Sequence, residues 1–165
     1  MTKKILIVFD ASSNDLKDFK LDEENPHQSA AEIIEDAEEI RGALLALGYN
    51  ASIYDLKGTL WDLPAVIKKE RPDLVFNFCE SLGDDPMGEI RAACLFELLE
   101  LPYTGSSPYT LAVALNKARA KEIFSFYKIP TPKFLVAKRS SEIKETGDLS
   151  FPLIVKPIAE DGSIG

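Results

Sequence analysis

The chain has 165 residues, enough for one well-filled core or for one domain followed by part of a second. Hydrophobic residues make up 45% and charged residues 28%, which is typical of a folded globular protein and excludes a disordered or fibrous chain. The net charge of −8 repels nucleic acid and anionic membranes, so a small molecule is the expected kind of partner.

Targeting signals and cysteine chemistry are not indicated. No apolar stretch approaches the length of a membrane span, and the residues after Met1 lack the core and cleavage site of a signal peptide. We therefore expect a cytoplasmic protein with no membrane partner. Cys79 and Cys94 are too few for a disulfide scaffold or a zinc site, and we expect them to be reduced and without a chemical role. The lone His27 receives no role.

The first half of the chain alternates strand and helix patterns. Three short apolar runs predict strands, at residues 4–9, 51–56 and 74–78. Ser29 and Glu32 form a capping box before a helical pattern that ends at Gly48, and residues 63–70 form a shorter helical pattern. The order βαβαβ predicts a three-layer α/β fold with a parallel sheet, in which ligands bind beyond the carboxyl ends of the strands.

Three more helices are expected after the third strand. One opens at Pro86, one opens at Ser107 with Pro108 behind the cap, and one spans residues 117–127. Residues 103–104 predict a brief fourth strand between the first two of these helices. The sheet is therefore expected to continue beyond its third strand.

The sequence changes character at residues 129–132, where two prolines end the last helix. We place a domain boundary here, so that residues 1–130 form the α/β domain and residues 131–165 begin a second domain that is truncated. The elements expected in this second part are strands at 133–137 and 153–156 and a short helix opening at Ser140.

Two lysines carry the clearest indication of a ligand. Lys156 ends an apolar strand pattern, where an unpaired ammonium group must reach water or an anion. Lys117 stands at a helix junction, where a solvated charge is the commoner role. The loop after Lys156 matches neither a Walker A loop nor a dinucleotide fingerprint, but its backbone N–H groups are open to phosphate oxygens; a simple hairpin turn is the alternative. The small residues of this loop are Gly162, Ser163 and Gly165.

An acidic loop follows the third strand. Its candidate substrate-side residues are Glu80, Ser81, Asp84 and Asp85. Asp85 suits a helix cap, so one interpretation is structural. The other is that Glu80, or the backbone around Gly83, contacts a polar substrate at the edge of the sheet.

Five segments taken together resemble the D-alanine:D-alanine ligase group of the ATP-grasp superfamily. They are residues 78–85, 101–106, Asn116 and Lys117 with Lys121, 129–132 and 151–157. The resemblance implies a Rossmann-like pre-ATP-grasp domain followed by an incomplete ATP-grasp subdomain. It also implies ATP binding by Lys117, Lys156, Gly162, Ser163 and Gly165, with Ser163 in the phosphate lid.

Members of this group join a carboxylate to an amine through an acylphosphate made from ATP, with magnesium ions neutralising the transferred phosphoryl group. The resemblance implies the same reaction for the full-length enzyme, with ATP and Mg²⁺ as cofactors and an amino acid or another carboxylate as substrate. The magnesium-binding carboxylates of the group lie downstream of the phosphate loop. We therefore expect no metal ligands, no tightly bound cofactor and no turnover in this chain alone.

Three departures from the group leave D-alanine specificity undecided. Residues 10–27 replace the Gly-Gly-x-Ser-x-Glu stretch after the first strand, Cys79 stands where the group has a histidine, and Gly162 replaces a serine. A divergent carboxylate–amine ligase is the favoured interpretation, and the alternative is a non-catalytic module that binds a small ligand or forms a homodimer. A phospho-receiver with Asp10 as acceptor lacks the further acidic residues and the strand-end lysine that it would need.

Overall fold

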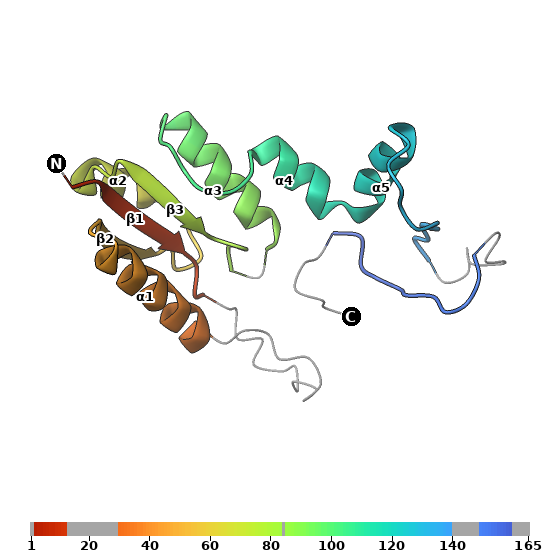
Figure 1. Cartoon of the computed structure of the whole chain (residues 1–165), viewed down its shortest axis with the longest axis horizontal. Coiled ribbons are helices and arrows are strands. Elements are labelled where there is room, and N and C mark those ends of the chain that lie inside the picture. Colours follow the sequence, from red (N-terminus) through yellow and green to blue (C-terminus); the bar gives the residue numbers. More distant parts are fainter. Residues whose placement is uncertain (1, 13–29, 84, 140–148, 160–165) are drawn as a thin grey trace. The chain divides into compact units, whose positions relative to one another are not determined.

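The computed structural model describes residues 2–12, 30–83, 85–139 and 149–159 (Figure 1). The chain divides into two compact units, Met1–Leu111 and Ala112–Gly165, which we call unit 1 and unit 2. The domain boundary predicted at residues 129–132 stays a prediction. Within the described residues, no helix combines the length and the apolar character that a membrane span needs.

Unit 1 is built on a parallel sheet with the strand order β2-β1-β3 (Figure 1). The strands are β1 (Lys4–Phe9), β2 (Asn50–Asp55) and β3 (Leu74–Phe78). Ile5 of the central strand is paired with Ala51 on one side and with Leu74 on the other. The predicted parallel sheet is confirmed, with each strand within a residue of its expected position.

The expected fourth strand is present only as a single parallel bridge between Val75 and Tyr103. Val75 donates its N–H to the Pro102 carbonyl at 2.9 Å and accepts the Thr104 N–H at 3.0 Å. The chain then turns at Gly105, whose φ of 101° lies in the left-handed region that favours glycine. The extended segment is therefore too short to form a longer ladder.

Helices cover both faces of this sheet, which gives the predicted three-layer α/β architecture (Figure 1). The helices of unit 1 are α1 (Ala30–Ala46), α2 (Leu63–Glu70), α3 (Met87–Leu98) and the start of α4 (Pro108–Leu115). Leu6 and Val8 of β1 pack with buried residues of α2 and α3 on one face. Ile7 and Phe9 pack with Ala37 of α1 on the other. Because side chains alternate along a strand, the apolar run of β1 fills both cores.

Helix ends follow the capping signals of the sequence. After α1, Gly48 has a φ of 85° and donates its N–H to the Leu45 carbonyl, while Tyr49 donates to Leu44, which is the Schellman pattern. Ser107 caps α4 by accepting the Thr110 N–H on its hydroxyl at 3.3 Å. The start expected at Pro86 is one residue early, because Pro86 is the N-cap of α3. Ser29 lies outside the described residues.

Unit 2 contains α5 (Lys117–Phe126), which Asn116 caps by accepting the Arg119 N–H at 2.9 Å. The strands predicted at residues 133–137 and 153–156 are wrong, because neither segment forms a strand in the described part of the chain. Their apolar side chains are largely in solvent; Val155, for example, is 92% exposed. A strand needs a partner strand, and in the described part of the chain neither segment is paired with one. The helix expected from Ser140 lies outside the described residues.

The two helical glycines Gly42 and Gly88 should respond in opposite directions to substitution by alanine. A Cβ at Gly88 would lie 2.1 Å from the backbone nitrogen of Leu82, whereas a Cβ at Gly42 meets nothing within 4 Å. We expect Gly88→Ala to lower the free energy of unfolding by about 3 kcal/mol, a typical overpacking effect. Gly42→Ala should raise it by about 0.5–1 kcal/mol through helix propensity. Urea denaturation measures both, and a loss of stability in both variants would contradict the close approach of α3 to Leu82.

Candidate functional site

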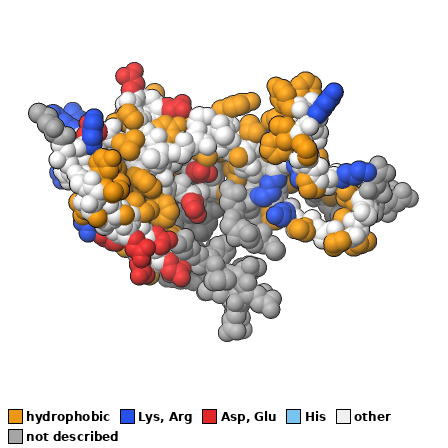
Figure 2. Space-filling model, in the orientation of Figure 1, with side chains coloured by type: hydrophobic (Ala, Val, Ile, Leu, Met, Phe, Trp, Pro, Cys, Tyr) orange, Lys and Arg blue, Asp and Glu red, His pale blue; other side chains and the backbone are white. Residues whose placement is uncertain are grey.

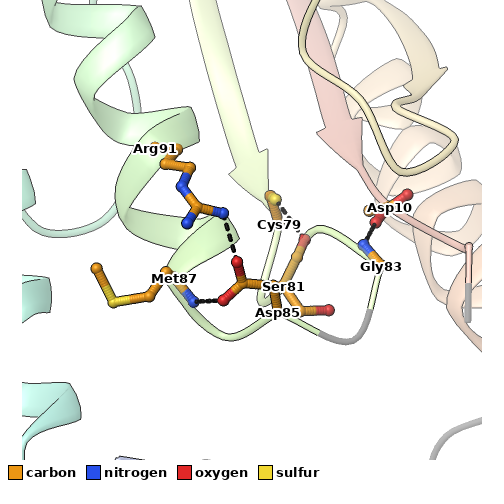
Figure 3. Close-up of polar contacts among 7 residues, drawn as sticks. All are labelled: Asp10, Cys79, Ser81, Gly83, Asp85, Met87 and Arg91. Atoms are coloured by element: carbon orange, nitrogen blue, oxygen red, sulfur yellow. Dashed lines mark hydrogen bonds and ion pairs between the residues drawn. The ribbon is translucent and has the colours of Figure 1, made fainter. Parts of the chain in front are cut away.

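The loops after the three strands meet at the carboxyl edge of the sheet, and a buried carboxylate lies at their centre. Asp10 directly follows β1 and is only 8% exposed. Its Oδ1 atom accepts the Ser12 hydroxyl at 2.6 Å, the Ser12 N–H at 3.3 Å and the Gly58 N–H at 2.8 Å. Its Oδ2 atom accepts the Gly83 N–H at 2.5 Å (Figure 3). One side chain thus connects the loops that follow β1, β2 and β3.

Sequence reasoning missed this role, since it considered Asp10 only as a phosphoacceptor. The available signal was an acidic residue placed directly after a fully buried strand. A second tie at the same edge supports the arrangement: Asp55 at the end of β2 accepts the Ala11 N–H at 3.2 Å and the Lys57 N–H at 3.0 Å. The edge is therefore held by carboxylates that accept backbone N–H groups.

Asp85 of the acidic loop has a structural role at the start of α3. Its carboxylate accepts the Met87 N–H at 2.9 Å and lies 2.5 Å from an Arg91 nitrogen (Figure 3). The Arg91 hydrogen bond, and after it the bond from Met87, lowers the pKa of Asp85 below its usual range. Asp85 is thus not the N-cap itself, which is Pro86, but it supports the first turn of α3 from the residue before the cap; its placement toward a substrate stays a prediction.

The other residues of the acidic loop differ in what they offer to a ligand. Glu80 is exposed to solvent, and the Ser81 carbonyl accepts the Cys79 thiol at 3.0 Å. The Gly83 N–H is taken by Asp10, so this backbone group is not open to a substrate. Asp84 lies outside the described residues. Of the two substrate contacts considered from the sequence, the Glu80 carboxylate is the one that the structure leaves available.

Cys79 is buried behind this loop at the end of β3, with 4% of its surface exposed. Burial, and after it the negative charges of Asp10 and Glu89, raises the pKa of the Cys79 thiol to about 12. The side chain is therefore a neutral thiol at physiological pH. In this protonated form it is a poor base and a poor nucleophile.

In unit 2, the segments that carry the two candidate ATP lysines meet. Lys117 donates its backbone N–H to the Ile158 carbonyl at 2.9 Å, so Ile158, two residues after Lys156, lies against the first turn of α5. Lys156 itself is exposed to solvent. The loop residues Gly162, Ser163 and Gly165 lie outside the described residues. The structure thus brings together the chain segments that carry Lys117 and Lys156.

Lys121, one turn further along α5, has a different role. Its ammonium group donates to the Thr131 hydroxyl at 3.1 Å and to the Pro132 carbonyl at 2.8 Å. It also lies 5.4 Å from the centre of the Phe134 ring, within the range of a cation–π contact. Lys121 therefore holds the segment after α5 against that helix.

The charge of the chain is divided unequally between the units. Unit 2 holds nine of the 19 Lys and Arg residues but only six of the 27 Asp and Glu residues. Figure 2 shows the visible acidic side chains on unit 1 and basic side chains recurring along unit 2. The overall charge of −8 therefore comes from unit 1, and unit 2 is the more favourable place for an anion.

These features define an α/β domain with a polar loop edge, followed by a basic unit. No family model matches the chain. The chain is 33% identical to a D-alanine–D-alanine ligase of Rhodospirillum rubrum over 124 residues, which are 74% of this chain and 39% of that protein. It is 35% identical to a D-alanine–D-alanine ligase of Wolbachia sp. subsp. Brugia malayi over 127 residues, 76% of this chain and 35% of that protein.

A third relative is D-alanine–D-alanine ligase B of Pseudomonas putida, with 38% identity over 105 residues, 63% of this chain and 32% of that protein. The chain thus spans between 32% and 39% of the length of these three relatives. The similarity confirms the resemblance to the D-alanine–D-alanine ligase group of ATP-grasp enzymes that the five sequence segments indicated.

The raised pKa of Cys79 can be tested in a Cys94→Ser variant, which leaves one thiol. In the folded protein we expect the thiol to stay protonated at pH 10, and in urea to ionise near pH 8.5 as in model peptides. Because the pKa is higher in the folded state, the stability that Cys79 contributes is present below about pH 8.5 and is lost as the pH rises toward 12. NMR of the labelled Cys79 Cβ measures the titration. Ionisation at the same pH in both states would show that the thiol is not desolvated.

Proposed function

We propose that this chain is the first part of an ATP-dependent carboxylate–amine ligase that resembles D-alanine–D-alanine ligase. In the full-length enzyme, a substrate carboxylate would be phosphorylated by ATP, and an amine would then displace the phosphate to form an amide. The observation that carries the proposal is the identity of 33–38% to three such ligases over 63–76% of the chain. We assign the two reactants to different units.

Unit 2 is the proposed nucleotide side. The backbone contact between Lys117 and Ile158 supports a joint role for Lys117 and Lys156, because it places both chain segments at the start of α5. The excess of basic residues in unit 2 supports the same role through attraction for phosphate groups. We propose that Lys117 and Lys156 contact ATP and that Gly162, Ser163 and Gly165 provide the phosphate loop. Lys121 has no part in this contact, since its ammonium group holds the segment after α5.

The carboxyl edge of the sheet in unit 1 is the proposed substrate side. Glu80 is an exposed carboxylate of this edge and suits the ammonium group of an amino acid. Asp85 would support the loop from the start of α3. We propose Ser81 and Asp84 as further substrate-side residues of this loop. The names of the relatives make D-alanine the first amino acid to test.

Magnesium is proposed for the full-length enzyme together with ATP. Among the described residues, no group of three or more His, Cys, Asp or Glu side chains is placed to hold a metal ion. We therefore assign the metal to the ATP phosphates and to residues outside the described part of the chain. Bound there, it would neutralise charge on the transferred phosphoryl group.

Measurements of ATP binding test the proposed role of Lys117 and Lys156. We expect this chain to bind ATP with magnesium with a dissociation constant weaker than about 10 μM, and a chain extended to the length of the relatives to bind more tightly. In the extended chain, Lys117→Ala or Lys156→Ala should weaken binding at least about tenfold, the loss of one charge-assisted phosphate contact. Calorimetry at physiological salt measures all of these.

Lys69→Ala is the matched control, because it removes an exposed lysine from α2 in unit 1. It should bind ATP as the unchanged chain does. If the extended chain bound ATP equally well with either candidate lysine replaced, the assignment of Lys117 and Lys156 would be wrong.

Homodimer formation is the second candidate function, and the exposed apolar side chains of unit 2 favour it. Phe126 is 79% exposed, Ile154 82% and Val155 92%. In this chain alone a second copy can cover them. We expect Val155→Asp to weaken any dimer seen by sedimentation, whereas Leu98→Asp, at an 80% exposed site of unit 1, should not. A monomer at about 100 μM, a concentration at which weak dimers still form, would remove this candidate.

A further inference from the structure

We propose that Asp10 is the positioning residue of the substrate edge: it binds no ligand itself, and its carboxylate holds in place the loop that carries Glu80. The inference rests on the proposed function only in taking Glu80 as the carboxylate that meets the substrate. The contacts that carry it are those of Figure 3 together with the bonds from the loops after β1 and β2.

Asp10 is already engaged by donors of its own chain. Four donor groups of the described residues contact its carboxylate, three at Oδ1 and one at Oδ2. Only 8% of the residue is exposed, and each of the four donors is a neutral backbone N–H or hydroxyl group. A buried carboxylate needs such donors, because an unpaired charge away from water costs several kcal/mol. The side chain is therefore committed to the loops around it.

The two carboxylate oxygens divide the loops between them. Among the described residues, Oδ1 accepts from Ser12 and Gly58, which follow β1 and β2, whereas Oδ2 accepts from Gly83, which follows β3. Gly83 has a φ of 61° and lies in a turn closed by reciprocal backbone bonds between Leu82 and Asp85, at 3.1 and 3.3 Å. The contact to Oδ2 thus fixes the tip of the Glu80 loop independently of the other loops.

The base of the same loop is fixed from both of its sides. Asp85 accepts the Met87 N–H at the start of α3, and the Cys79 thiol donates to the Ser81 carbonyl. Glu80 lies between these anchored points and is exposed. The Asp10–Gly83 bond ties the far side of this loop to the residue after β1, whereas the near side continues from β3, which pairs with β1. Glu80 lies between these two attachments, so we infer that the bond helps to set its position.

The variant Asp10→Asn separates positioning from general stability. An asparagine whose oxygen stays toward Ser12 and Gly58 keeps those acceptor contacts, but its NH₂ group faces the Gly83 N–H, where two donors repel. In this chain we expect amide hydrogen exchange at Gly83 to accelerate at least tenfold, with resonance shifts at Glu80 and Ser81. Exchange at Gly58 and at the core residue Ile7 should stay within about threefold, a local opening rather than global unfolding.

Asp10→Ala is the matched comparison, because it removes both acceptor oxygens and should release Gly58 as well as Gly83. If amide exchange accelerated equally at Gly58, Gly83 and Ile7 in Asp10→Asn, Asp10 would contribute only to general stability, and the proposal would be overturned. Unchanged exchange at Gly83 would overturn it too. If neither variant folds, the test is made by NMR on the unchanged protein. A through-hydrogen-bond coupling between the Gly83 nitrogen and the Asp10 carboxylate carbon supports the proposal, and its absence counts against it.

D-alanine provides a functional readout. Added to the unchanged chain, D-alanine should shift the resonance of residue 80. In Asp10→Asn the affinity for D-alanine should be at least threefold weaker. In Glu80→Gln the resonance of residue 80 should not shift. Equal affinity in Asp10→Asn and the unchanged chain would overturn the positioning role. If the unchanged chain does not respond at all, D-alanine is wrong as the substrate in the proposed function, and the exchange result alone decides on Asp10.

Discussion

The carboxylate of Asp10 holds together the edge of the sheet on which the rest of unit 1 depends. A charge that is only 8% exposed must be surrounded by donors, and here the donors come from the loops after all three strands. Gly58 and Gly83 both have positive φ angles, which direct their N–H groups toward the carboxylate. The need to satisfy one buried charge thus determines how three separate loops converge.

The same constraint reaches the helices and the chemistry of neighbouring groups. The loop that Asp10 holds leads directly into α3, where the Asp85 carboxylate accepts hydrogen bonds from Met87 and Arg91. Close packing at this point leaves no space for a Cβ at Gly88. The negative charge of Asp10 also adds to burial in keeping Cys79 protonated. Cys79 is therefore part of the packing of this edge.

The two units differ in charge and in exposure, which suits different ligands. Unit 1 is acidic, and its exposed Glu80 is the carboxylate that the proposed function assigns to an amino acid ammonium group. Unit 2 is basic, and its backbone joins the segments of Lys117 and Lys156. Its apolar side chains are largely exposed, for example at Phe151 and Val155. The chain spans between 32% and 39% of the length of the three relatives.

The sequence by itself determined the parallel sheet, because strands buried on both faces are continuous apolar runs, and the helix ends, because caps such as Ser107 and Gly48 act over a few residues. It also showed the ligase resemblance through local segments. Only the tertiary structure decided the role of Asp10, since its partners Gly58 and Gly83 lie 48 and 73 residues away. The strands expected at residues 133–137 and 153–156 failed for the same reason: an apolar run indicates burial, but a strand forms only where a partner strand is present.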